Sequence, residues 1–171
     1  MLRKVSLIRR AVVAILALAA SWFLMQAVHE LGHVLAAWAT GGTVVRVVLD
    51  PRTISRTGVL PNPAPLAVAW AGPLVGVAIP ALLAVLFRRF ASRSWRNYST
   101  FFAGFCLIAN GAYIGLGSWA GIGDAGDMLR HGSPRSSLVA FGVAAVLAGL
   151  WLWHGLTRRE EQSITAQTPP K

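Results

Sequence analysis

The chain has 171 residues, of which 55% are hydrophobic and only 13% are charged, and its formal net charge is +10. Its mean hydropathy of +0.57 is too high for an ordinary soluble domain and predicts an integral membrane protein. A large basic excess can indicate nucleic-acid binding, but these arginines gather in short segments beside apolar runs, which is typical of membrane flanks. We therefore expect a lipid bilayer around the chain and no nucleic-acid partner.

Four apolar runs are long enough to cross about 30 Å of hydrocarbon as helices. We place them at about 11–40, 64–87, 100–120 and 136–156. The first begins like a secretory signal peptide, but its apolar pattern continues through Trp38 without a cleavage site, which favours an uncleaved span. The sequence thus predicts an all-α integral membrane protein of about four transmembrane helices.

The segments between these runs differ in character. After the first run, TVVRVV and TISRTGVL flank the turn signal Asp50-Pro51, which predicts a short membrane-associated β-hairpin over 43–60. RRFASRSWRNYS, between the second and third runs, is predicted to be a basic loop. The polar segment 158–171 is expected to be a disordered tail. Residues 1–157 would then form a single membrane domain.

The basic residues predict an orientation in the membrane. The N-terminal segment, the loop after the second run and the tail hold 4, 4 and 3 Lys or Arg, against 3 in the hairpin region and 2 before the fourth run. By the positive-inside rule, both termini are cytoplasmic in a multi-pass protein of a bacterial-type plasma membrane. The first and third spans then run in the same direction, so their C-terminal ends share the outer leaflet.

The first apolar run contains HELGH, at residues 29–33. Positions i and i+4 lie on one face of a helix, so His29 and His33 can direct imidazole nitrogens at one ion, while Glu30 can contact a water on it. H-E-x-x-H is the spacing of zinc hydrolases. A charged residue in the bilayer costs about 3 kcal/mol on insertion scales, which favours metal binding over a packing role. Gly32 leaves space there for another helix or a substrate.

A catalytic zinc ion needs a third protein ligand. Asp124 and Asp127 lie in GIGDAGDML directly after the third run, in the leaflet where the first run ends. His131 lies on the same side in a basic polar loop, and His154 lies near the far end of the fourth run. A helix N-cap or a solvated loop acid is the alternative role for Asp124 and Asp127. The residues alone leave the third ligand open.

These motifs together resemble the site-2 protease family of intramembrane zinc metalloproteases. HELGH in a membrane span, AWAGPLVG at 69–76 in the next span and GDAGDML at 123–129 after the third occur in the family's order. The family also holds its zinc nearer the cytoplasmic side of the membrane. That implication is opposed to the charge count, which predicts a site near the outer leaflet.

The resemblance implies a role for individual residues. His29 and His33 would bind one Zn²⁺ per chain, with Asp124 as the third ligand and Asp127 as the second choice. Glu30 would polarise the attacking water.

Asn110, in IANGAYIG, matches the asparagine that helps to hold the oxyanion in the family. Fourteen residues separate Asn110 from Asp124, a longer spacing than the family usually has, and the prolines expected between them are absent. An interhelical hydrogen bond is the alternative role for Asn110.

The predicted function is zinc-dependent intramembrane proteolysis by a zinc metalloendopeptidase, with metal-activated water and Glu30 as the general base. The partners would be a membrane-spanning protein substrate and a regulatory membrane protein, since no PDZ- or CBS-like module is present. The alternative is a noncatalytic metal-binding membrane protein, either a degenerate relative or an accessory subunit.

Two features predict how a substrate would reach the site. An unpaired edge of the 43–60 hairpin would bind an extended substrate by strand addition. The Gly72-Pro73 pair in the second run either breaks the helix and opens a cavity or produces an ordinary proline kink.

Overall fold

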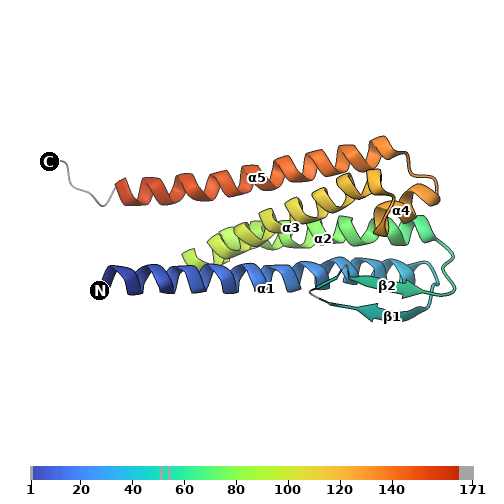
Figure 1. The fold of residues 1–171 in the computed structure, drawn as a ribbon, viewed down its shortest axis with the longest axis horizontal. Coiled ribbons are helices and arrows are strands. Elements are labelled where there is room, and N and C mark those ends of the chain that lie inside the picture. The colour runs from blue at the N-terminus through green and yellow to red at the C-terminus, as the bar shows by residue number, and fades with distance from the viewer. Residues whose placement is uncertain (1, 51, 54, 166–171) are drawn as a thin grey trace.

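A computed structural model describes residues 2–50, 52–53 and 55–165 of the chain (Figure 1). In this part of the chain five helices and two strands follow one another in the order α1 (Leu2–Ala39), β1 (Val44–Val48), β2 (Arg56–Val59), α2 (Pro65–Phe90), α3 (Arg93–Ala120), α4 (Gly123–Arg130) and α5 (Arg135–Thr165). Helices α1, α2, α3 and α5 are long and apolar enough to cross a membrane. The predicted fold class, four apolar spans with a hairpin between the first two, is confirmed.

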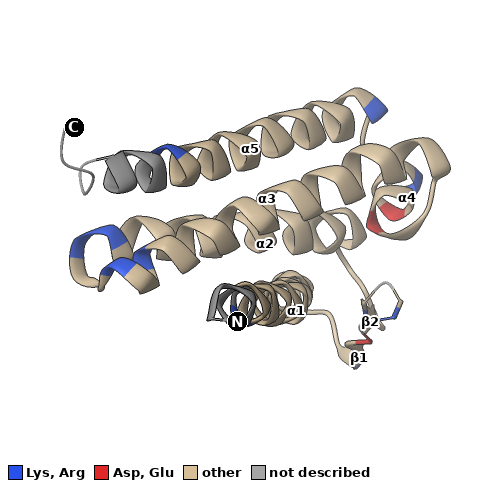
Figure 2. Ribbon diagram, turned by 60° about the vertical axis from the view of Figure 1, so that its left-hand side comes forward, with Lys and Arg blue, Asp and Glu red and all other residues tan. Residues whose placement is uncertain are grey.

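The long helices lie side by side as a bundle in which α1 packs on α2, α2 on α3 and α3 on α5 (Figure 1). The start of α1, the α2–α3 turn and the end of α5 lie at one end of the bundle. The hairpin and α4 lie at the opposite end. Figure 2 shows Lys and Arg gathered at the α2–α3 turn and acidic residues at α4 and the hairpin. The two ends of the molecule therefore differ in charge.

Glycines allow these helices to approach closely. A Cβ at Gly32 on α1 would overlap the backbone of Ala71 and Gly72 on α2, which confirms the expectation that Gly32 admits another helix. In the same way, Gly111 on α3 lies against the backbone of Gly142 on α5. Such small-residue contacts let membrane helices gain van der Waals packing where lipid supplies no hydrophobic driving force.

Three segments are more helical than the sequence suggested. Helix α2 continues through Gly72-Pro73, so the pair does not break the helix. Helix α3 begins at Arg93, which leaves only residues 91–92 as the connection where a basic loop was predicted. Helix α5 covers 158–165 of the predicted tail, while 166–171 lie outside the described residues. Arg, Glu and Gln are good helix formers, so a polar segment can continue a helix that begins in the membrane.

The hairpin is confirmed. Strands β1 and β2 pair antiparallel, with Val47 opposite Thr57 and an irregularity between Val44 and Arg46. Within the described residues β2 has β1 as its one ladder neighbour, so its other edge is unpaired.

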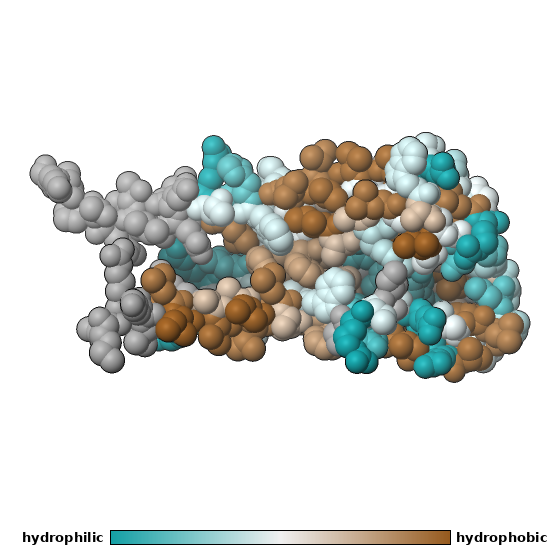
Figure 3. Space-filling view, in the orientation of Figure 1, coloured by the Kyte–Doolittle hydropathy of each residue, from teal (hydrophilic) through white to brown (hydrophobic). Residues whose placement is uncertain are grey.

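Large hydrophobic side chains cover the outward faces of the helices, as for Leu16, Leu83 and Val143. In Figure 3 hydrophobic residues cover much of the visible face, and hydrophilic residues lie toward the hairpin and α4 and also at the opposite end of the bundle. Exposed apolar faces around a partly polar interior are expected when the solvent is lipid.

Candidate metal centre

Three ligand-type atoms converge at the hairpin end of the bundle. The Nε2 atoms of His29 and His33, one turn apart on α1, are 3.1 Å from each other. The Oδ2 atom of Asp124 lies 2.7 Å from Nε2 of His29 and 3.3 Å from Nε2 of His33. Both imidazoles are buried. Helices α1 and α4, far apart in the sequence, thus bring two nitrogens and one carboxylate oxygen to one point.

A sharp turn after α3 positions Asp124. Gly121 ends α3 with φ +65°, and Gly123 follows with φ +55°, backbone conformations that glycine adopts without steric cost. Helix α4 then folds back and buries Ala125 and Met128 completely against the core. Asp124 lies in the first turn of α4 and is directed toward the histidines.

Of the two aspartates that the sequence left open, the structure brings only Asp124 to the histidines. Asp127 forms an ion pair with Arg130 on its own helix and is half exposed. The Oδ2 atom of Asp124, in contrast, lies within 3.3 Å of the Nε2 atoms of both imidazoles. His131 bonds the backbone of Asp127 and lies outside the cluster.

The second nitrogen of each imidazole is held by a carbonyl oxygen. Nδ1 of His29 lies 2.6 Å from Oδ1 of Asn110, whose Nδ2 donates to the Cys106 carbonyl at 2.9 Å. Nδ1 of His33 lies 2.7 Å from the Val68 carbonyl. Because a carbonyl only accepts, both Nδ1 atoms carry the ring proton. Both Nε2 atoms are then lone-pair donors, the arrangement found in metal-binding histidines.

The cluster fits a zinc ion. Two Nε2 lone pairs and a carboxylate oxygen within 3.3 Å of one another repel unless a cation lies among them. Tetrahedral zinc with bonds of about 2.0–2.1 Å places its ligand atoms about 3.3 Å apart. The observed separations, 2.7 to 3.3 Å, are slightly shorter than this requirement. Two imidazoles and a carboxylate are a common ligand set of catalytic zinc.

Glu30 is fixed beside the cluster by the hairpin. The Thr57 hydroxyl on β2 donates to Oε2 of Glu30 at 2.6 Å. The other oxygen, Oε1, is buried and has no hydrogen-bond partner among the described residues. Ligand atoms of His29, Glu30 and His33 all lie within 4.8 Å of one another. One carboxylate oxygen is thus anchored, and the other remains available for a proton near the metal ligands.

The AWAGPLVG segment forms the back of the site. A Cβ at Gly72 would overlap Nε2 of both His29 and His33, and a Cβ at Gly76 would press on the side-chain amide of Asn110. These two glycines, four residues apart on α2, therefore leave the space that the imidazoles and the asparagine fill.

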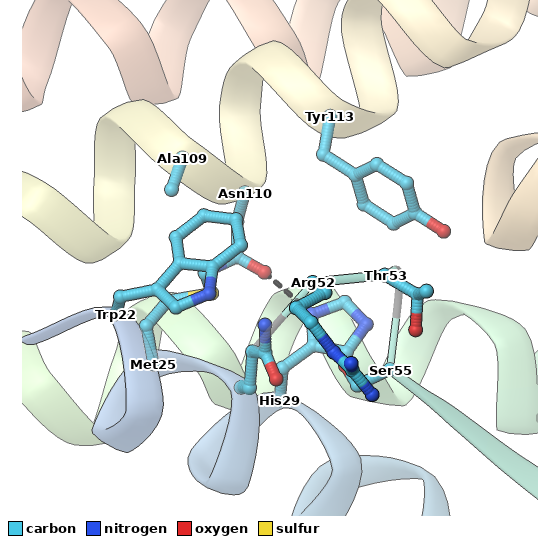
Figure 4. A pocket seen from close by; sticks show the side chains of 10 residues that line it. Trp22, Met25, His29, Arg52, Thr53, Ser55, Ala109, Asn110 and Tyr113 are labelled. Atoms are coloured by element: carbon cyan, nitrogen blue, oxygen red, sulfur yellow. Dashed lines mark hydrogen bonds between the residues drawn. The ribbon is translucent and has the colours of Figure 1, made fainter. Parts of the chain in front are cut away.

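Two pockets meet at the cluster. The apolar pocket, about 350 Å³, lies between α1, α3 and the hairpin turn and is lined by residues that include Trp22, Met25, Gln26, His29 and Ala109 (Figure 4).

The polar pocket, about 460 Å³, is lined by residues that include His33, Arg56, Thr57, Asp124 and Asp127. The cluster therefore lies between a mainly apolar space and a more polar one. The amide oxygen of Gln26 is buried on the apolar side without a hydrogen-bond partner among the described residues.

Four helices long and apolar enough to cross a membrane surround a His–His–Asp cluster with an adjoining glutamate, a group of side chains able to hold a metal ion. A protein-family profile described as Peptidase M50B-like matches residues 5–123, more than half of the chain, and the chain belongs to this family. The match agrees with the resemblance to the site-2 proteases. Comparisons with curated proteins and with solved structures gave no match. The family match ends one residue before Asp124, so Asp124 is placed by the structure rather than by the match.

Sequence reasoning missed several residues of the site. Thr57, the Val68 carbonyl and Tyr113 were not singled out, although Thr57 holds Glu30 and Val68 holds His33. The G-x-x-x-G spacing of Gly72 and Gly76 was a readable signal of close helix packing at this point. No comparable signal marks Thr57 or Val68, because their roles depend on contacts between distant segments.

Proposed function

We propose that the chain is a zinc-dependent intramembrane endopeptidase that cleaves a membrane-spanning protein. The observation that carries the proposal is the convergence of His29, His33 and Asp124 beside a buried glutamate, in a chain of the Peptidase M50B-like family. His29, His33 and Asp124 would hold one Zn²⁺. When bound there, zinc supplies Lewis acidity that polarises a peptide carbonyl and acidifies a water.

Glu30 acts as the general base. Its free Oε1 accepts a proton from the attacking water, and Glu30 then returns that proton to the leaving amine. The bond from Thr57 to Oε2 keeps the carboxylate in one orientation during both transfers. Asn110 fixes the His29 imidazole with its Nδ1 proton.

The substrate is an apolar segment of a membrane-spanning protein. A helix hides its scissile carbonyl in backbone hydrogen bonds, so it must unwind before cleavage. The apolar pocket receives a hydrophobic side chain of the unwound segment, and Gln26 accepts one freed backbone N–H. The unpaired edge of β2 binds the extended chain by strand addition, since Thr57 already lies against the site. Water enters from the polar pocket.

The orientation follows from the two ends of the bundle. The end with the α2–α3 turn and the described ends of α1 and α5 carries the larger share of the basic residues. We place that end, with both termini, in the cytoplasm, and the metal centre toward the outer leaflet of a bacterial-type plasma membrane. Regulation comes from a membrane protein partner.

The test is cleavage of single-span peptides by zinc-loaded protein in detergent. The substrates are leucine-rich helices interrupted at different positions by Gly or Pro, and mass spectrometry locates each cut. Glu30→Gln keeps the shape of the side chain but removes the base, and we expect it to retain zinc while kcat falls by about 10²–10⁴-fold. Equal cleavage by wild type and Glu30→Gln would contradict the proposal. Zinc binding without cleavage would support the noncatalytic alternative.

A further inference from the structure

Tyr113 lies where the two pockets meet. It comes one turn after Asn110 on α3, and its ring stands edge-on to the His29 imidazole, with the ring centroids 5.9 Å apart. Tyr113 and Ser55 are the described residues that line both the apolar and the polar pocket. Figure 4 shows the phenol on the far side of the apolar pocket from Trp22, with its hydroxyl directed away from Asn110.

The Tyr113 hydroxyl has a proton left to donate. The backbone N–H of Asp124 donates to the hydroxyl oxygen at 3.2 Å, which fixes the phenol beside Asp124, the third ligand of the candidate metal centre. Among the described residues the Tyr113 hydroxyl makes this one hydrogen bond, and its oxygen is the acceptor. A Cβ at Gly123 would overlap the same oxygen, so the glycine leaves room for it. A phenol can accept and donate at once.

Asn110, which the resemblance implied as the oxyanion residue, is engaged elsewhere. Its oxygen is directed at His29, and its amide group donates to the Cys106 carbonyl on its own helix. This side chain therefore positions the imidazole. A different donor is needed for the carbonyl oxygen of the substrate.

We infer that the Tyr113 hydroxyl donates a hydrogen bond to the carbonyl oxygen of the scissile peptide as negative charge builds on that oxygen. The inference rests on the proposed function and deepens it. The phenol keeps its proton throughout, because the proton of the attacking water passes through Glu30 to the leaving amine. A donor held in place before the reaction needs no reorganisation when the charge develops.

The test compares zinc-loaded wild type with Tyr113→Phe, which removes only the oxygen, and with Tyr98→Phe as the matched control. Tyr98 lies near the start of α3 and stacks on Phe102, away from the site. We expect Tyr113→Phe to keep one zinc per chain and to lose about 10²–10³-fold in kcat with KM within about twofold. The phosphinic analogue of Leu-Leu, a tetrahedral mimic, should bind about 100-fold more weakly to Tyr113→Phe and equally well to Tyr98→Phe.

Two results would overturn the inference. One is loss of zinc from Tyr113→Phe with unchanged kcat per bound zinc, which would make the phenol only an anchor for Asp124. The other is unchanged affinity for the phosphinate, especially if Ser55→Ala weakens it instead. The phosphinate measurement decides the matter even if no peptide is cleaved. Failure of the proposed function is recognised separately, because it appears as absent zinc in the wild type or as cleavage that survives in Glu30→Gln.

Discussion

The two halves of α1 have opposite burial patterns. Among the described side chains of residues 7–20, which are mostly apolar, none is buried. The second half is more polar, yet its polar residues Ser21, Gln26, His29, Glu30 and His33 are buried. Apolar residues of that half, such as Leu35 and Trp38, are exposed instead. In a lipid environment, polar side chains are the ones that have to be buried within the protein.

The comparison shows what each half contributes. Because nearly all the described side chains of residues 7–20 are exposed, the sequence of the first half has to satisfy only the bilayer. The second half faces α2, α3 and the hairpin, and the side chains of His29, His33 and Glu30 each have a hydrogen-bond partner there. Equally conservative substitutions in the two halves should therefore differ greatly in their effects on zinc binding, activity and the free energy of unfolding.

The largest effect is expected when the space behind the histidines is filled. In Gly72→Ala the new methyl group would overlap both Nε2 atoms, so bound zinc should fall to less than about a tenth of the wild-type level and cleavage should disappear. Gly155→Ala is the control, because its Cβ would meet open space. Zinc per chain is measured by mass spectrometry on protein that elutes normally in size exclusion. Full zinc in Gly72→Ala would contradict the close approach of α2 to the site.

A smaller effect is expected when His29 loses its partner. Asn110→Leu keeps a similar volume but leaves the Nδ1 proton of His29 buried without an acceptor. Loss of such a contact lowers metal affinity about 10–100-fold, which competition with a chromophoric chelator would measure. Asn97→Ala, near the start of α3, should leave the affinity unchanged. An unchanged affinity in Asn110→Leu would mean that the asparagine does not orient the imidazole.

The hairpin contact should matter less than the metal ligands. Thr57→Val keeps the shape of the side chain but removes the donor to Glu30, so kcat should fall about tenfold, equivalent to about 1.4 kcal/mol, while zinc is retained. Thr57→Ser restores the hydroxyl and should recover most of the rate. If Val and Ser at this position behave alike, the hydroxyl does not hold the base.

The smallest effect is expected in the lipid-facing half of α1. Leu16→Ala exchanges one lipid-exposed apolar side chain for another, so the free energy of unfolding should change by less than about 0.5 kcal/mol. Met25→Ala, in the second half, removes a side chain packed with Phe102 and Cys106 and should cost about 2 kcal/mol. Reversible unfolding in bicelles measures both. Equal losses would show that the two halves are packed alike.

Much of this arrangement could be predicted from local patterns. Apolar run length located the four spans, β-branched residues around Asp50 located the hairpin, and the i, i+4 spacing placed His29 and His33 on one face. These features depend on neighbours in the sequence. The choice of Asp124 over Asp127 does not, because it depends on the turn at Gly121 and on which face of α4 is buried.

The remaining misses have a common physical cause. A Pro inside a helix removes one hydrogen bond, but buried Pro73 and Pro80 pack inside α2 and the helix continues, which excludes the helix break that the sequence had left open beside a proline kink. Asn110 has a doubtful spacing in sequence terms, yet the fold brings it to the imidazole across the bundle. Contacts between helices determined both the continuity of α2 and the position of Asn110.

The most direct test of the central claim is zinc content per chain in detergent-purified wild type, His33→Ala, Asp124→Asn and Asp127→Asn. The account predicts about one zinc in the wild type and in Asp127→Asn, and little or none in His33→Ala and Asp124→Asn, because only the first aspartate reaches the histidines. Retention of zinc by Asp124→Asn with loss in Asp127→Asn would contradict the assigned ligand set. Absence of zinc from every preparation, even after zinc is supplied, would contradict the metal centre itself.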